Sequence, residues 1–426
     1  MHHITEINNN FLIFVTTKNS KVSKATFIKV VKRIAIVFTS IAVLLVISIL
    51  SIPYIFENEV NSKVKSLVNE HITGELNYSK VRLTFFDQFP LLTASMDDVL
   101  LKGAEPFKND TLLAAKKVSF GVDLMSLLKS KIVIDKFIVN SGKINILVDS
   151  LGNANYNIYK SSSADATKTQ DNSESSALAF QLIKLEKTNL HYEDRSIPLQ
   201  IEAKDLEYEG KGDLMSNIFD LNTRAKIASF SFSFDNELYV DKKSIDANLL
   251  TRINTNNLSF VFERNDIKIN QLPVRFRGLL SFISHGYHLD FKLKSQESTL
   301  AELLSLVPNS YASWIKDLSV KGTSEVFVNL EGDYIVDNNK MPNLSLGLMV
   351  NNGFLAYKQS TNPLTDWNAK LRIDLPALNP DSLQIDLKQF DFKVASGYFN
   401  AQGNIAGLHP VRSEEHTSEL QSLRHL

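Results

Sequence analysis

Hydrophobic residues follow two patterns along the chain, and the first is one unbroken apolar run near the N-terminus. Residues 34–52 contain no charged side chain. As an α-helix they would extend roughly 28 Å, which is about the thickness of a bilayer's hydrocarbon core. Their polar side chains are all Ser or Thr, whose hydroxyls can donate to the carbonyl one turn earlier. Residues 34–56 are therefore expected to form a transmembrane helix.

A buried core helix and a cleaved signal peptide both fit this run less well. A helix buried in a soluble core normally keeps a polar stripe, and residues 34–52 have none. A cleaved signal peptide has a shorter apolar region, about 7–15 residues, that ends in a small-x-small site. Here Pro53-Tyr54-Ile55-Phe56 follows instead, so we expect an uncleaved anchor.

The charges on either side of the run predict its orientation. Lys and Arg residues precede it, the last being Lys32 and Arg33, whereas Glu57 and Glu59 follow it. Positive charge remains on the cytoplasmic side, so residues 1–33 are expected to be a cytoplasmic leader. No later run is long enough to span, which predicts a single-pass protein with most of the chain across the membrane.

Residues 57–73 show the apolar spacing of an amphipathic helix, which Gly74 would end. After that the second pattern begins, in which apolar and polar residues alternate as they do along β-strands. A capping box at Thr299 and Glu302 predicts the start of one helix, which has the sequence LAELLSLV and ends before Pro308. Residues 123–128 are a further, shorter helical candidate.

The expected strands share this two-residue period and are bounded by turn residues. Ser141-Gly142 indicates a hairpin between residues 132–139 and 144–148, and residues 230–234 (FSFSF) alternate most regularly. The other expected strands are 76–84, 180–185, 190–192, 199–208, 258–262, 267–269, 274–277, 289–293, 326–330, 344–350, 371–375, 383–387 and 390–394.

So many alternating strands predict a mainly β fold with a few helices, in which each sheet has one apolar and one hydrated face. Two closed sheets could bury such faces against each other. One open, elongated and curved sheet could instead leave a long apolar trough. The periodicity leaves both arrangements open. In either case the alternation places the following large apolar side chains on the apolar side: Phe230, Phe232, Phe234, Phe260, Phe262, Leu289, Phe291 and Leu293.

Two segments depart from this pattern. Residues 161–177 are a low-complexity polar stretch, which we expect to be a flexible loop between a first β-rich region, residues 57–160, and a second, residues 178–411. Residues 412–426 show no alternation and resemble translated sequencing-adapter read-through. They are expected to be non-native, with the natural chain continuing beyond about Val411.

Composition narrows the function classes. The formal net charge of −1 gives no overall field that would attract nucleic acid, and basic residues alternate with apolar ones instead of clustering. The chain has no cysteine, which excludes disulfides and thiolate metal sites. Phe, with 26 residues, outnumbers Tyr with 12 and Trp with 2, and many Phe residues fall in the alternating strands.

No group of residues forms a convincing catalytic or metal site. Asp97 and Asp98 are neighbours, and His285 and His288 lack the spacing of zinc ligands. His191-Tyr192-Glu193-Asp194 could be an acid–base cluster, but a hairpin turn before Ile197-Pro198 explains it better. Gly210-Lys-Gly-Asp213 lacks the spacing of a phosphate-binding loop. We therefore expect no enzyme activity, no cofactor and no metal.

Several short blocks, taken in order, resemble the AsmA-like family of bacterial inner-membrane proteins. They are the N-terminal span with its amphipathic helix, residues 81–90 (VRLTFFDQFP), 91–103 (LLTASMDDVLLKG), 118–131 (VSFGVDLMSLLKSK), 149–157 (DSLGNANYN), 190–194 (LHYED) and 353–357 (GFLAY). Together they cover most of residues 30–411.

The resemblance implies an elongated, curved antiparallel β-sheet forming an apolar groove, with its bulk in the periplasm. Relatives are thought to conduct phospholipid between the inner and outer membranes, and their fold is similar to that of bridge-like lipid transfer proteins. The expected partners are membrane phospholipid and the inner membrane, and other envelope proteins are a further partner class compatible with the resemblance. The alternative is a structural or regulatory factor in outer-membrane assembly that does not conduct lipid.

Overall fold

The chain divides into two compact units, Met1–Glu59 and Val60–Leu426. The computed structural model describes residues 32–44, 47, 51, 72–84, 92–122, 134–158, 181–214, 216–307, 315 and 317–407. In the first unit residues 32–44, 47 and 51 are helical, and the Thr39 hydroxyl donates to the Ala35 carbonyl at 2.8 Å, as the apolar run predicts. Among the described residues, no helix has the length and hydrophobicity needed to cross a membrane. Part of the predicted span 34–56 lies outside these residues, so it stays a prediction.

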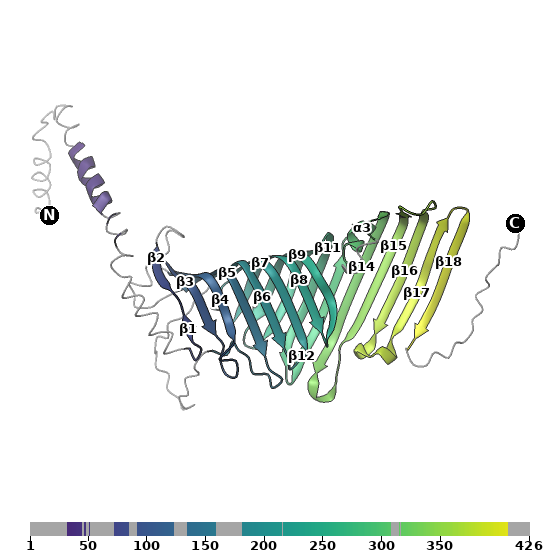
Figure 1. Ribbon diagram of the computed structural model, residues 1–426, viewed down its shortest axis with the longest axis horizontal. Helices are drawn as coiled ribbons and strands as arrows, with labels where there is room; N and C mark the ends of the chain where they lie inside the picture. The colour runs from purple at the N-terminus through teal and green to yellow at the C-terminus, as the bar shows by residue number, and fades with distance from the viewer. Residues whose placement is uncertain are drawn as a thin grey trace, which may run out of the picture. The chain divides into compact units, whose positions relative to one another are not determined.

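The second unit is built on one sheet of 18 strands (Figure 1). Its strands are β1 (Leu76–Asn77), β2 (Lys80–Thr84), β3 (Leu92–Lys102), β4 (Thr111–Val122), β5 (Ile134–Val148), β6 (Leu182–Asp194), β7 (Leu199–Lys211), β8 (Ile218–Phe234), β9 (Glu237–Asn254), β10 (Ser259–Ile269), β11 (Leu272–Ile283), β12 (Gly286–Ser295), β13 (Ser298–Thr299), β14 (Leu318–Ile335), β15 (Asn343–Tyr357), β16 (Leu364–Leu375), β17 (Gln384–Val394) and β18 (Gly397–Ala406). The helix α3 (Leu300–Leu304) and three 3-10 turns, η2 (Val336–Asn338), η3 (Pro376–Leu378) and η4 (Pro380–Ser382), complete the described elements.

Strands that are consecutive in the chain are neighbours in the sheet. The short strands β1 and β2 both pair with β3, and β13 pairs with β14 beside the end of β12. The ladders are antiparallel except between β5 and β6, which run parallel. The expectation of an antiparallel sheet is therefore wrong at this pair. The connection after β5 brings the chain back beside the start of β5, so β6 runs in the same direction.

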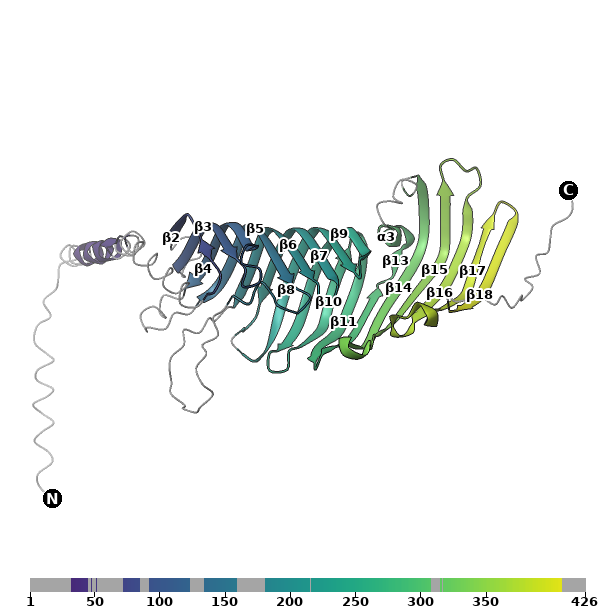
Figure 2. The same ribbon diagram turned by 60° about the horizontal axis from the view of Figure 1, so that its bottom comes forward.

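The strands change slope along the sheet. In Figures 1 and 2 strands β3 to β8 slope one way and strands β14 to β18 the other. This is the accumulated twist that neighbouring strands of L-residues produce. Twist over this many strands brings the sheet's two ends into different orientations while its side chains keep their alternation.

The hairpin predicted at Ser141-Gly142 is wrong, because β5 passes through these residues without turning. Ser141 adopts the left-handed conformation with φ 51°, and Ala115 and Lys117 of β4 pair with Gly142 and Asn140 on either side of it. A side chain at position 142 would meet Val139 Cγ1 at 2.7 Å, so only Gly fits there. The strand bends sharply at this point instead of reversing.

Several strands predicted as pairs of short segments are also single strands with an internal bend. Residues 180–185 and 190–192 fall in or beside β6, residues 258–262 and 267–269 in β10, and residues 383–387 and 390–394 in β17. Register shifts mark the bends at Leu185/Thr188 of β6, Phe262/Asn265 of β10 and Leu387/Phe390 of β17. Each register shift adds one extra residue to the strand. Apolar side chains three residues apart across the shift therefore point to the same side of the sheet.

Left-handed residues recur at these bends in neighbouring strands. They are Asp98 of β3, Ser141 of β5, Lys187 of β6, Asp205 of β7, Lys242 of β9, Asn352 of β15 and Asp366 of β16. Asp98 and Ser141 both lie opposite Lys116 of β4, and Ser141 lies opposite Lys187. From β3 to β6 the bends therefore form a line across the strands, along which this part of the sheet folds.

Side chains satisfy backbone N–H groups at these irregular positions. Lys187 N–H donates to Glu207 Oε1 at 3.1 Å, and Asp205 N–H donates to Asn189 Oδ1 at 3.0 Å. Lys242 N–H similarly donates to Ser231 Oγ at 3.1 Å. These side-chain oxygens replace the carbonyl acceptors that the ladder does not supply at the irregular residues, so regular pairing resumes on either side of each bend.

The core lies along the line of bends. One buried cluster joins side chains from both sides of the bends in β3 and β4, namely Met96 with Val99 and Ala115 with Val118. It extends to Val139 of β5, which is fully buried. Because the two arms of each strand meet on the same side of the sheet at the bend, this side is concave there.

The helix α3 confirms the predicted capping box. Thr299 Oγ1 accepts from the Glu302 N–H at 3.2 Å, and Thr299 N–H donates to Glu302 Oε2 at 2.7 Å. The predicted amphipathic helix at residues 57–73, the helical candidate at 123–128, the loop at 161–177 and the tail at 412–426 fall wholly or almost wholly outside the described residues.

Candidate functional site: an apolar sheet face

The strand registers place the predicted groove residues on one side of the sheet. Side chains of directly paired residues point to the same side. Phe230, Phe232 and Phe234 pair with Ala203, Ile201 and Leu199 of β7. Across β9, Phe230 pairs with Lys243, and Phe262 of β10 pairs with Thr251. Positions 243 and 251 lie on the same side of β9, so the two groups of Phe residues share one face, called the apolar face below.

The remaining predicted residues continue this face. Phe262 pairs with Gly278 of β11, and Gly278 pairs with Phe291 of β12. The smallest side chain lies between the two rings, where a Cβ at position 278 would clash with the Phe291 ring at 2.3 Å. Phe260, Leu289 and Leu293 occupy alternate positions on the same strands. All eight predicted side chains therefore lie on the apolar face.

Three aromatic rings from successive strands pack together on this face. The Phe262 and Phe276 ring centroids are 5.1 Å apart, and those of Phe276 and Phe291 are 5.5 Å apart. Phe232 lies beside Tyr239 at 6.1 Å and is not part of this group. The sequence prediction did not include Phe276, although its place in the alternating Val274-Arg-Phe-Arg277 run marks it as equivalent to the others.

Burial changes from the bends toward the strand ends. Ala203 and Leu206, on either side of the left-handed Asp205, are 2% and 5% exposed. By contrast, all eight predicted side chains are half-buried. Large apolar side chains are usually covered by a second layer in a closed core. Here the described residues leave them only partly covered, as an open trough requires.

The sheet curves around the apolar face between β6 and β12. Burial, and next the Asp194 carboxylate at the end of β6, raise the pKa values of the Tyr287 and Tyr334 phenols on β12 and β14. The Tyr192 phenol also has a raised pKa, chiefly through burial and then through Asp194. These strands are far apart in the ladder. Their ends can influence one another only because the sheet bends toward its apolar side.

The opposite face is polar. Ion pairs cover it, including Arg252 with Asp220 at 2.9 Å, Lys294 with Glu325 at 3.2 Å and Arg372 with Asp374 at 2.6 Å. Arg252 and Lys294 pair in the ladder with Val261 or Arg275 and not with the Phe rings. Exposed pairs of this kind contribute little stability, but they keep this side hydrated and leave the apolar face as the one suited to hydrophobic ligands.

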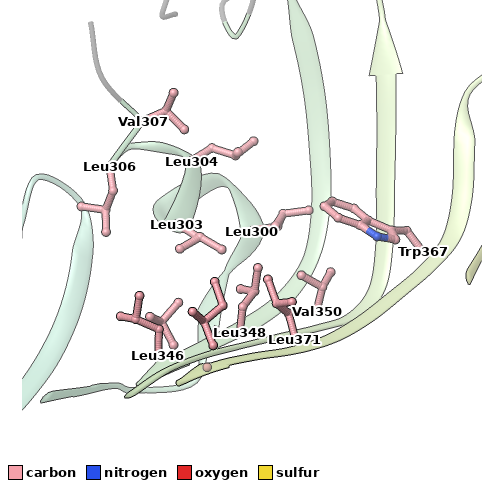
Figure 3. Close-up of a pocket in the computed structure, with 13 residues that line it drawn as sticks. Leu300, Leu303, Leu304, Leu306, Val307, Leu346, Leu348, Val350, Trp367 and Leu371 are labelled. Atoms are coloured by element: carbon pink, nitrogen blue, oxygen red, sulfur yellow. The ribbon is translucent and has the colours of Figure 1, made fainter. Parts of the chain in front are cut away.

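The helix α3 lies over the apolar face of strands β14 to β16 and forms one wall of a cavity that is open to solvent. Leu300 packs on Val350 and Ala369, and all three are buried. The cavity beside this contact measures about 450 Å³ and is lined by Leu300, Leu303, Leu304, Leu306, Val307, Val326, Leu346, Gly347, Leu348, Val350, Trp367, Leu371 and Ile373. Figure 3 shows Leu303 and Leu306 facing the side chains of Leu346 and Leu348 across it. The sequence predicted the helix but not this cavity.

One lysine interrupts the apolar face. Lys243 of β9 is 5% exposed, and its ammonium donates to the Val307 carbonyl at 2.8 Å. Burial lowers the pKa of this ammonium. The alternation does not predict this site, because Lys242-Lys243 is typical of an exposed pair and the left-handed Lys242 reverses which lysine faces inward.

Some of the polar motifs considered as catalytic make contacts within turns and between strands. Asp194 Oδ1 accepts from the Ser196 hydroxyl at 2.6 Å and from the Ser196 N–H at 2.9 Å, which confirms the predicted turn. His191 Nδ1 lies 2.5 Å from Glu202 Oε1 on the polar side. His288 contacts Asp333 at 2.7 Å, while His285 lies in the turn before β12. Among the described residues no cluster of three or more His, Asp or Glu could hold a metal.

Comparison with known proteins supports one family. A family model described as the AsmA family matches residues 28–324, well over half of the chain. Strands β15 to β18 lie beyond the matched residues but continue the same sheet. No curated protein matches the sequence, and no solved structure matches the fold.

Proposed function

The chain belongs to the AsmA family, and from this membership and its apolar face we propose that it binds phospholipid and helps move it toward the outer membrane. In this proposal residues 34–56 anchor the protein in a bacterial inner membrane, and the sheet lies in the periplasm. The protein acts by binding, without catalysis and without nucleic acid, in support of envelope biogenesis. Acyl chains lie along the apolar face, and their head groups remain in water.

The half-buried Phe side chains carry this proposal. A soluble protein rarely leaves a long run of large apolar side chains partly uncovered unless the run binds something. The face continues across β7 to β12, where Ile201, Phe232, Phe262 and Phe291 follow one another through paired or alternating positions. Its length and its mainly apolar side chains suit acyl chains better than a compact polar ligand.

The test replaces Phe232 by Asp. On an open trough this carboxylate stays hydrated, so the fold survives while the charge obstructs the path of the lipid. In a closed core it would be buried without a partner, which costs several kcal/mol against a typical domain stability of about 5–15 kcal/mol. Ser233→Asp is the matched control, because the neighbouring residue pairs with Gln200 and points to the polar side.

Each full-length variant would be purified in mild detergent, its bound lipid measured by mass spectrometry and its melting temperature recorded. We expect Phe232→Asp to lose most of its phospholipid and to melt close to the wild type, and Ser233→Asp to keep both properties. Collapse of Phe232→Asp alone would indicate a closed core and favour the alternative, a structural or regulatory factor in outer-membrane assembly. Unchanged lipid in a folded Phe232→Asp variant would contradict lipid binding on this face.

A further inference from the structure

The cavity under α3 has the character of a site for a single hydrophobic chain. Its volume of about 450 Å³ falls within the roughly 300–1,000 Å³ typical of small-molecule sites. Its lining side chains are aliphatic apart from Trp367. In Figure 3 Val307 and Trp367 lie far apart among the labelled lining residues, one beyond the end of α3 and the other on β16. They mark what are called the two ends of the cavity below.

A positive charge lies at the Val307 end. The Lys243 ammonium donates to the Val307 carbonyl, and among the described residues it forms no ion pair. Its strand partner is Phe230. Burying an ammonium whose described hydrogen-bond partner is a neutral carbonyl is unfavourable. Burial lowers the pKa of Lys243, although the charge of Asp241 acts in the opposite direction. An anion placed here would form a charge-assisted hydrogen bond that the protein itself does not supply.

A second polar group at the other end is also unused. Trp367 Nε1 is buried and has no hydrogen-bond partner in the described structure. Buried indole N–H groups usually find an acceptor. The ring packs against Phe390 at 6.4 Å and forms part of the cavity wall, so it would touch any chain that fills the cavity.

We propose that the cavity beneath α3 holds one acyl chain of an anionic amphiphile, whose carboxylate or phosphate binds the Lys243 ammonium at its Val307 end. This site rests on the proposed lipid-binding function and makes it more specific. On the open part of the apolar face lipids are bound without regard to charge, whereas under α3 one lipid is retained because of its acidic group. The two possible sources of that group are a fatty acid and an acidic phospholipid.

The test uses the quenching of tryptophan fluorescence by bromine, which requires contact. The chain has two tryptophans, Trp314 and Trp367, so Trp314→Phe leaves Trp367 as the reporter. The full chain in mild detergent is titrated with dibrominated stearic acid, with its uncharged methyl ester and with lysophosphatidylglycerol carrying the same brominated chain. We expect at least one of the two acidic ligands to quench Trp367 at a concentration about tenfold or more below that of the ester.

Substitutions then locate the charge. Lys243→Met keeps the length of the side chain and should remove the preference for the acidic ligand, while Lys243→Arg should keep it. Lys268→Met is the matched control, because this lysine is exposed on the polar side of β10 and pairs with Asp246. If Lys243→Met does not fold, the acid-to-ester ratio in the wild type and in Lys243→Arg still decides.

The ligand that quenches at the lower concentration identifies the source, fatty acid or acidic phospholipid. Equal quenching by the ester and both acidic ligands would overturn the role of Lys243. Absence of quenching by any ligand would overturn the cavity as an acyl-chain site. If either result is found while the wild type still co-purifies phospholipid and Phe232→Asp still loses it, the proposed function stands and only the site under α3 is rejected. Failure of the site and failure of the proposed function are therefore distinguishable.

Discussion

Single left-handed residues lie at the bends of several strands of this sheet, among them β3, β5, β6 and β7. The backbone conformation at Lys187, with φ 46°, costs an ordinary L-residue about 1–2 kcal/mol relative to Gly. The bend turns Leu185 and Thr188 toward the same side, and Thr188 is fully buried. This burial offsets the strain at Lys187. Local strain thus provides a concave apolar face.

Substitution of Lys187 tests this trade. Lys187→Gly should raise the free energy of unfolding by up to about 1 kcal/mol, because Gly adopts a positive φ without strain. Lys187→Val should lower it, since a β-branched residue is poorly tolerated there. At Lys226, an exposed position of β8 with ordinary backbone, the order should reverse, with Gly the less stable variant. Urea denaturation of the four variants measures both pairs. The same order at both positions would argue against a strained bend.

The sequence contains a signal for these bends. Apolar residues three apart occur inside several strands, as in Val139 to Gly142 and Ala203 to Leu206. Such spacing also arises between separate strands, which is why Ser141-Gly142 resembles a hairpin. Period-two reasoning assigns a new element wherever the alternation shifts. Residues such as Lys187, which are not turn formers, give no local indication that the chain continues through a bend.

At the scale of elements, α3 is a short helix held in place by neighbours distant in sequence. Five residues are too few to be stable alone. The Asn270 amide donates to the Ser305 carbonyl at 2.6 Å, and Lys243 donates to that of Val307. The capping box predicted where the helix starts because its partners are three residues apart. Its position over β14 to β16 depends on distant contacts, which the local pattern does not encode.

Removing the cap should loosen α3 without unfolding the sheet. Thr299→Ala removes the hydroxyl that accepts from the Glu302 N–H, while the bond from the Thr299 N–H to the Glu302 carboxylate can remain. The loss of this cap should cost the helix about 1 kcal/mol. Faster hydrogen exchange is expected at the amides of Ser305, Leu306 and Val307, which donate to carbonyls within α3, with little change in the strands. Glu302→Gln is the control, because Gln also completes a capping box. Unchanged exchange in Thr299→Ala would mean that the packing on Val350 and the contacts from Asn270 and Lys243 hold the helix without the cap.

At the scale of the whole molecule, the sheet separates an apolar side from a side covered with ion pairs. The alternation predicted both sides and placed the eight Phe and Leu side chains on the same side as the strand registers do; their role in a lipid groove stays a prediction. It could not predict the curvature that brings Asp194 near Tyr287, because curvature results from many bends and from twist along the sheet. The parallel pairing of β5 and β6 was equally inaccessible, since alternation shows which way side chains point but not the direction of the neighbouring strand.

The polar side predicts how stability depends on pH. Hydrogen bonds from Lys184 and Arg372 are the largest causes that lower the pKa values of Glu186 and Asp374. A carboxyl group with a lower pKa in the folded state stabilises the fold above its unfolded pKa and loses this contribution as pH falls through the folded value. The urea concentration at the unfolding midpoint should therefore be nearly constant from about pH 7 to pH 5. It should decrease once the pH is lower than the ordinary carboxyl pKa values, 4.5 for Glu and 3.8 for Asp. An equal midpoint at pH 7 and pH 3 would contradict this account.

The nearly sequential order of the strands has a consequence for the route by which this chain folds. From β6 to β12 each strand pairs with the one just before it across a short connection, so each addition requires little loop closure. The step from β5 to β6 must instead bring together strands separated by residues 149–181, a longer connection than the one between the paired strands β12 and β14. We therefore expect the strands up to β5 and the strands from β6 onward to pair first, each group by adding strands to its edge. The β5–β6 pairing should form last and limit the folding rate.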